Sequence, residues 1–240
     1  SFSVSPFFEF TKEFMSFEPE AYSLKWYKQM LGICSVDVTT VCTNKWVLGV
    51  RNSFIIGLAS TFLATSLGTI AALGLSRPQM PFKGLIMALL ISPMIVPLII
   101  TAAGMFFFYS QLGLTHTFTG LILAHTALGT PFVVITVTAT LTGFDTNLIR
   151  ASQSLGANTI KTFFKVIMPL ILPGVISGAL FAFITSFDEV VVVLFIGSVE
   201  QITIPKQMWA GLRQETSPVI LSMATCLVLL SIALLTTVEL

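Results

Sequence analysis

Five apolar stretches constrain what this chain can fold into more than any other feature of the sequence. They run at about residues 47–75, 84–109, 118–141, 169–196 and 218–240. Each has roughly 20 residues or more, enough to cross a hydrocarbon core of about 30 Å as a helix. Only 10% of the residues are charged and 55% are apolar, whereas soluble domains carry about 25% charged residues. The sequence therefore predicts an all-α, polytopic membrane helical bundle.

The loops between the stretches indicate how this bundle is oriented. Loop 76–83 contains two basic residues and no acid, and loop 142–168 contains three basic residues and one acid. Both loops lie on one side of the bundle, and their positive charge predicts that this side is cytoplasmic. On the opposite side, residues 1–46, 111–117 and 197–217 carry basic residues that acids nearly balance.

Five spans with this orientation place the N-terminus outside the cytoplasm. Residues 1–22 contain no apolar signal segment that could deliver it there. We therefore expect a sixth span before Ser1, an external segment at 1–46 and a transmembrane domain at 47–240. The external segment holds Cys34 and Cys42. They could form a disulfide in an oxidising compartment or remain two unpaired thiols, and their spacing alone does not decide between the two.

Acidic residues inside the spans are few. Asp188 and Glu189 are the only acids within a span apart from Glu239. A carboxylate at membrane depth costs roughly 2.5–3.5 kcal/mol, so it faces water or the bundle interior. One reading is that Asp188 or Glu189 lines a pathway for a cationic solute. The other is a structural role, for example as the partner of a helix terminus.

Prolines and glycines predict local features of two spans. Pro93 and Pro97 interrupt the second stretch, and proline breaks or bends a helix. Such a break either lines a cavity or is a simple bend. In the fourth stretch, Gly174 and Gly178 are four residues apart, a spacing that permits close contact between helices.

The residue sets that typify enzymes are absent from the sequence. Neither His116 nor His125 has a second ligand at metal spacing. There is no G-x-S-x-G elbow and no phosphate-binding P-loop. We therefore expect no catalytic residues, no metal and no cofactor in this chain, and the lack of a basic tract predicts no nucleic-acid partner. Any ATP-driven work would need an ATPase on a partner subunit.

The segment from Arg150 to Gly178 is a polar interruption between two apolar runs. Its first part is a helix of small residues that Gly156 can end in the left-handed conformation. Asn158 can then cap a second helix, in which Ile160, Phe163, Phe164 and Ile167 recur on one face. An amphipathic helical hairpin at the surface of a membrane protein is typical of a docking element.

This segment resembles the EAA motif of type I ATP-binding-cassette importer permeases. That motif has Glu-Ala-Ala, three residues, Gly, nine residues, and then Ile-x-Leu-Pro. Here Arg150-Ala151-Ser152 occupy the first three positions, Gly156 the glycine position, and Val166 to Pro169 the end of the pattern. The chain departs from the motif at Arg150, in place of glutamate, and at Ser152, in place of the second alanine.

The resemblance implies a coupling helix that docks on an ATPase. The residues expected to make that contact are Arg150, Ala151, Ser152, Leu155, Gly156, Ala157 and Phe163. The family further implies two ATPase subunits that use ATP and Mg, a second permease subunit, an external substrate-binding protein, and a multi-pass location in the bacterial inner membrane. The glutamate's salt bridge does not carry over, and Arg150 instead suits an acid of the ATPase or Asp145.

Similarity beyond the motif extends over most of the chain and is greatest to the spermidine/putrescine permeases. It includes residues 22–27, 52–54 and 125–134, with Asp188-Glu189 and Ile204-Pro205. This implies a polyamine as the transported solute. Related permeases carry other small solutes such as opines, amino acid derivatives and phosphonates. A stand-alone secondary carrier would need inverted repeats, which the sequence does not show, and a membrane-embedded hydrolase would need a catalytic set.

Overall fold

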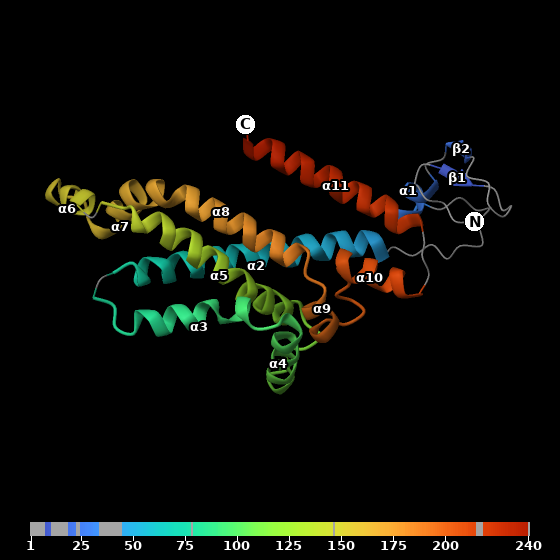
Figure 1. Ribbon diagram of the computed structural model, residues 1–240, viewed down its shortest axis with the longest axis horizontal. Helices are drawn as coiled ribbons and strands as arrows, with labels where there is room; N and C mark the ends of the chain where they lie inside the picture. Colours follow the sequence, from blue (N-terminus) through green and yellow to red (C-terminus); the bar gives the residue numbers. More distant parts are fainter. Residues whose placement is uncertain are drawn as a thin grey trace. The chain divides into compact units, whose positions relative to one another are not determined.

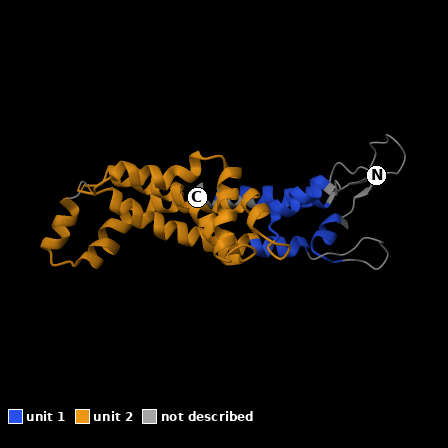
Figure 2. Cartoon of the chain, turned by 90° about the horizontal axis from the view of Figure 1, so that it is seen from below, with its two compact units in different colours: residues 1–52, 202–240 blue, residues 53–201 orange. Residues whose placement is uncertain are grey.

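The computed structural model describes residues 8–10, 19–22, 25–33, 45–77, 79–145, 147–214 and 218–239 (Figure 1). They form two compact units. The first comprises Ser1–Asn52 and Ile202–Leu240, and the second comprises Ser53–Gln201 (Figure 2). The two units are defined by contacts within the chain. They do not test the expected boundary between an external segment at 1–46 and a transmembrane domain at 47–240, which stays a prediction.

The first unit holds the short elements near the two ends of the chain. Its elements are β1 (Phe8–Phe10), β2 (Pro19–Tyr22), α1 (Lys25–Met30), the first residues of α2, α10 (Ile204–Gln214) and α11 (Pro218–Glu239). The antiparallel pair β1–β2 is a small addition to a fold that is otherwise helical, as expected. Helix α10 approaches α11 closely at Gly211, where a Cβ would lie 2.7 Å from Ile220 Cδ1.

Three of the five expected spans form single helices with nearly the predicted bounds. Helix α2 covers Lys45–Leu75, α5 covers Phe118–Thr142 and α11 covers Pro218–Glu239. Within the described residues, three helical segments are long and apolar enough to cross a membrane, and a bent pair could supply a fourth. The described apolar part of α11 is Val219–Leu229, so the expected total of five spans stays a prediction.

The second stretch is not a straight helix. It forms α3 (Lys83–Ile95) and α4 (Leu98–Gln111), whose axes differ by 105°. Val96, between them, is extended with φ −71° and ψ 135°. The residue before a proline is pushed out of the helical region, and Pro97 has no N–H to continue the ladder. The break expected from the prolines is therefore at Pro97, whereas Pro93 lies inside α3.

The predicted span at 169–196 begins where α8 begins but is wrong at its C-terminal end. Helical structure runs without interruption over Thr159–Phe187 and includes α8 (Met168–Phe187). It ends at Asp188, and α9 (Val191–Ile196) follows as a separate short helix. The polar Asp188-Glu189 pair interrupts the apolar run, and the two residues adopt a turn between the helices.

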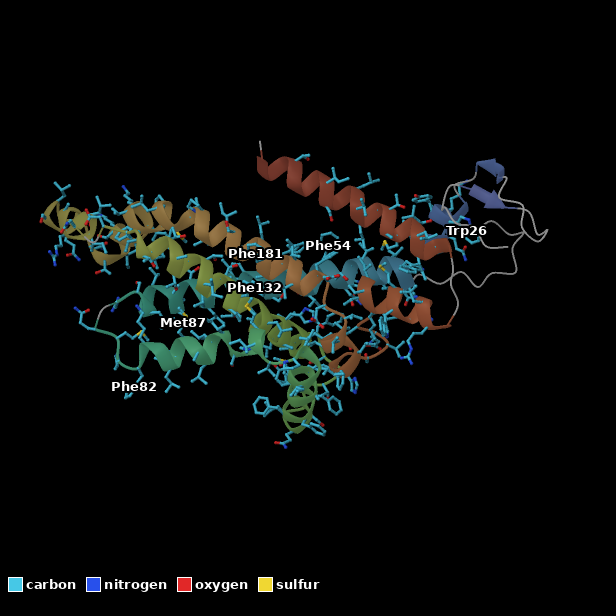
Figure 3. All side chains as sticks on the ribbon, in the orientation of Figure 1. Trp26, Phe54, Phe82, Met87, Phe132 and Phe181 are labelled. Atoms are coloured by element: carbon cyan, nitrogen blue, oxygen red, sulfur yellow. The ribbon has the colours of Figure 1, made fainter. Side chains whose placement is uncertain are left out.

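Helices α5 and α8 form the centre of the second unit through close backbone contact. A Cβ on Gly178 would lie 2.8 Å from Val133 Cα, and one on Gly174 would overlap Thr140 Oγ1. The expected packing role of these two glycines is therefore confirmed. Phe132 of α5 stacks on Phe181 of α8 with ring centroids 6.1 Å apart (Figure 3).

A buried polar junction joins three helices of the same unit. His125 Nδ1 lies 2.7 Å from Ser186 Oγ, and Ser60 Oγ donates to the same Ser186 oxygen at 3.0 Å. Buried polar groups are stable when they are hydrogen-bonded to one another. His125 is therefore a buried histidine whose Nδ1 is hydrogen-bonded to a neighbouring helix.

Candidate functional site

The coupling hairpin, as we name residues 147–167, begins with helix α6 (Asn147–Ser154). Asp145 Oδ1 accepts a hydrogen bond from the Asn147 N–H at 2.9 Å, next to the start of the helix. At the other end, the Gly156 N–H donates to the carbonyl of Gln153 and the Ala157 N–H donates to that of Ser152, at 2.9 and 3.1 Å. This pair of bonds is a Schellman motif. The expected glycine terminator is confirmed, because Gly156 has φ +80°.

The second arm of the hairpin begins at Asn158, as predicted. Its Oδ1 accepts a hydrogen bond from the Lys161 N–H at 2.8 Å and caps α7 (Thr159–Thr162). A five-residue π-helix, η1 (Phe163–Ile167), then leads into α8. Pro169 follows the π-helix. In a regular α-helix the ring of Pro169 would crowd the carbonyl of Lys165, four residues back. Lys165 lies within the wider turn of the π-helix.

A side-chain hydrogen bond joins the two arms. Ser152 Oγ and Thr162 Oγ1 are 2.9 Å apart, and both residues are buried. Ser152 Oγ also donates to the Ile149 carbonyl at 2.8 Å. Since a serine hydroxyl has one proton, Thr162 is the donor between the arms. Serine in place of the motif's alanine thus provides an acceptor that alanine lacks.

We expect Ser152→Ala to loosen the hairpin, because it leaves the buried Thr162 hydroxyl without its acceptor. Loss of such a bond costs on the order of 1 kcal/mol, which predicts about fivefold faster trypsin cleavage within the hairpin. Ser152→Ala combined with Thr162→Val should restore much of the resistance. The matched control is Ser154→Ala, which removes an exposed hydroxyl bonded to the Arg150 carbonyl. Equal cleavage of the Ser152 and Ser154 variants would contradict the assignment.

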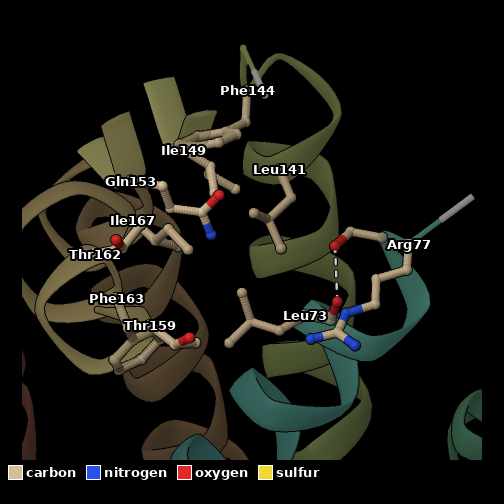
Figure 4. A pocket seen from close by; sticks show the side chains of 11 residues that line it. Leu73, Arg77, Leu141, Phe144, Ile149, Gln153, Thr159, Thr162, Phe163 and Ile167 are labelled. Atoms are coloured by element: carbon tan, nitrogen blue, oxygen red, sulfur yellow. Dashed lines mark hydrogen bonds between the residues drawn. The ribbon is translucent and has the colours of Figure 1, made fainter. Parts of the chain in front are cut away.

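The apolar residues of the second arm do not share one face, contrary to the expectation from their spacing. Ile160 and Phe164 are well exposed, whereas Phe163 is half-buried and, with Ile167, lines a cavity beneath the hairpin (Figure 4). Phe163 and Phe164 touch edge to face with centroids 4.9 Å apart. The π-helical turn rotates successive side chains by less than an α-helix does, and so changes the phase of the pattern.

The structure separates the residues expected to dock into exposed and buried ones. Leu155, at the tip, is 88% exposed. Arg150, Ala151 and Gly156 are also exposed, and Ala157 is half-buried. Ser152 instead points inward to the other arm. Neither the role of Ser152 in the hairpin nor its partner Thr162 could be recognised from the sequence, because a serine–threonine pair ten residues apart has no characteristic pattern.

Arg150 makes no ion pair within the described part of the chain. The Asp145 carboxylate, one of the two partners considered for it, accepts from the Asn147 backbone. An exposed guanidinium on α6 is therefore available to a group outside the chain.

Asp188 and Glu189 have different environments although they are adjacent. Glu189 is buried, and its Oε1 accepts a hydrogen bond from the Val192 N–H at 2.9 Å, which satisfies the start of α9. Asp188 is exposed. The geometry at Glu189 corresponds to the helix-terminus role.

The possible disulfide lies outside the described residues, since both Cys34 and Cys42 do. The described cysteine, Cys226, is a half-buried free thiol.

Comparisons with known proteins agree on one family. A family model described as binding-protein-dependent transport system inner membrane component matches residues 64–240. The spermidine/putrescine transport system permease protein PotC of Haemophilus influenzae is 28% identical over 225 residues, which cover 94% of this chain and 84% of that protein. The sulfoquinovosyl glycerol transport system permease protein SmoH of Agrobacterium fabrum is 31% identical over 147 residues, 61% of this chain and 52% of that protein.

A solved structure shows the same fold. It is a crystal structure of a bacterial ABC transporter involved in the import of the acidic polysaccharide alginate, and one of its chains superimposes with a TM-score of 0.69. The match covers 92% of this chain and 80% of that chain, at 15% identity.

Proposed function

The chain belongs to the binding-protein-dependent transport system inner membrane components, and from that membership we propose that it imports a polyamine with an ATPase docked on the coupling hairpin. The complex would contain two ATPase subunits that use ATP and Mg, a second permease subunit and an external binding protein. This chain supplies part of the pathway and the docking surface, and ATP is hydrolysed on the partner.

The exposed tip of the hairpin carries the docking proposal. Leu155 is a large apolar side chain that is 88% exposed beside a polar turn. Burying it on a partner would be favourable by about 1.5–3 kcal/mol. Ile160 and Phe164, also exposed, add apolar surface on the second arm.

The continuous helix behind this tip supports the coupling mechanism. Residues Thr159–Phe187 form one helical segment from the second arm into the span, and α8 is fixed to α5 at Gly174 and Gly178. Movement of a docked ATPase would therefore displace α8 together with the hairpin. The ATPase would bias the bundle between two states through contacts that differ between them.

The substrate proposal is supported by the similarity to PotC over nearly the whole chain. The similarity to a sulfoquinovosyl glycerol permease covers less of the chain. Import of an opine, an amino acid derivative or a phosphonate is the alternative. In such a complex the external binding protein, and not the permease chain, would carry most of the selectivity for the solute.

Reconstitution tests the proposal. The complete complex, with its ATPase and binding protein, is placed in proteoliposomes, and ATP-dependent uptake of spermidine, putrescine and amino acids is measured. We expect ATPase copurification and uptake of polyamines in preference to amino acids. Uptake that does not require the ATPase would contradict the coupling proposal. ATP-dependent uptake that excludes polyamines would contradict only the substrate proposal.

Substitutions at the adjacent acids should separate a pathway role from a capping role. Asp188→Asn removes an exposed charge, and we expect slower polyamine uptake with normal thermal stability. Glu189→Ala removes the cap of α9 and should cost about 1 kcal/mol of stability, while Glu189→Gln keeps an accepting oxygen and should cost less. Uptake and thermal unfolding are measured for all three variants. Unchanged uptake by Asp188→Asn would argue against a cation pathway at this residue.

A further inference from the structure

A cavity of about 370 Å³ lies between the coupling hairpin and the ends of two spans (Figure 4). Leu73 of α2 and Leu141 of α5 form one wall, and Ile149, Phe163 and Ile167 of the hairpin form the other. The lining is thus mainly apolar, and it belongs both to the spans and to the hairpin. A molecule in this cavity would contact both.

Arg77 brings a positive charge to the rim of the cavity. It follows the last turn of α2, its side chain is exposed, and it makes no ion pair within the described residues. The neighbouring residues up to Lys83 include no acid. Arg77 also borders a second cavity of about 390 Å³ with Gly74, Gln79 and Met80. The guanidinium is therefore accessible from two sides and lacks a negative partner in its own loop.

The position of the cavity indicates which kind of anionic molecule could bind there. Leu75 and Thr142 are the last residues of the apolar helices α2 and α5, so this region lies where the spans leave the membrane. Lipid is the most abundant amphipathic molecule at that level. Basic pockets between spans on the cytoplasmic side accommodate anionic headgroups. The combination of an apolar cavity and an unpaired arginine matches an acyl chain joined to a phosphate.

We propose that an anionic phospholipid of the cytoplasmic leaflet binds here, with an acyl chain in the 370 Å³ cavity and its phosphate on Arg77. The lipid bridges α2 and α5 to the coupling hairpin and stabilises the arrangement in which the cavity is open. This inference rests on the cytoplasmic position of the hairpin in the proposed function. It does not depend on which solute is transported.

Retention of lipid by the purified complex tests the site. The complete complex is reconstituted in nanodiscs of phosphatidylcholine and phosphatidylglycerol, extracted in mild detergent, and analysed by native mass spectrometry for retained phosphatidylglycerol. We expect Arg77→Gln to lower the retained amount about fivefold, since one basic residue near an anionic surface contributes on the order of 1 kcal/mol. Leu141→Trp, which fills the cavity without changing charge, should lower it as well. Lys83→Gln, in the same loop but outside the cavity lining, is the matched control.

Three outcomes would overturn the proposal. Unchanged retention in both Arg77→Gln and Leu141→Trp would show that the cavity holds no lipid. An equal loss in Lys83→Gln would show attraction to the basic loop as a whole rather than a site. Loss of the ATPase from Arg77→Gln with unchanged lipid would assign the cavity to the ATPase instead. Because ATPase copurification is recorded in the same experiment, failure of this inference is distinguishable from failure of the docking proposal.

Discussion

Gly156→Asp should abolish ATP-dependent transport while the protein still inserts in the membrane. Gly156 ends α6 with φ +80°, a conformation that costs a residue with a side chain roughly 1–2 kcal/mol. The substitution also places a carboxylate beside Leu155 at the tip proposed to enter the ATPase. A Cβ at Gly156 would meet no atom within 4 Å, so the effect arises from the backbone and the charge and not from a clash within this chain. Uptake and stimulated ATP hydrolysis are the measurements.

Two further variants divide this effect into its causes. Gly156→Asn has the size of the aspartate variant and, like aspartate, tolerates the left-handed conformation better than most residues. It adds no charge, so it should retain part of the activity. Gly143→Asp is the matched control, because Gly143 is also exposed and free of neighbours within 4 Å but has a negative φ of −90°. Normal uptake by Gly156→Asp, or an equal loss in Gly143→Asp, would contradict the role assigned to the tip.

The sequence predicts the ends of the coupling hairpin's helices well because those ends are set by local chemistry. Gly156 and Asn158 act on backbone groups within five residues of themselves. The side-chain directions further along were not predictable. Whether Phe163 or Phe164 faces out depends on the π-helical turn at Phe163–Ile167, which the apolar spacing does not predict. Ser152 was expected at the docking surface, yet its orientation is fixed by Thr162 on the other arm.

The ends of the spans also differ in how well the sequence predicts them. The stretch at 118–141 forms one helix, as predicted. Pro131 lies inside α5 and does not end it. Hydropathy predicts one continuous stretch at 169–196 because it averages over Asp188 and Glu189. In the folded chain, Glu189 accepts from the Val192 N–H and thereby starts a new helix. Mean hydropathy over a stretch does not predict a single hydrogen bond of this kind.

Leu155→Asp should weaken ATPase binding more than any other substitution of a single exposed side chain in the hairpin. The side chain is 88% exposed in this chain, so its removal leaves the hairpin's own packing intact. Burial of a leucine at an interface contributes about 1.5–3 kcal/mol, which corresponds to roughly 10- to 150-fold in affinity. An aspartate there would also require a carboxylate to be desolvated on docking. Binding of the purified ATPase to the permease in nanodiscs measures the loss directly.

Val199→Asp is the control that separates docking from general damage. Val199 is 79% exposed in the turn after α9, on the side of the bundle opposite to the hairpin according to the predicted topology. The same apolar-to-acidic change there should leave ATPase affinity unchanged. If both variants bind the ATPase as tightly as the wild type, the tip of the hairpin does not enter the ATPase. If only Leu155→Asp releases it, while Phe164→Asp has a smaller effect, the contact centres on the turn and not on the second arm.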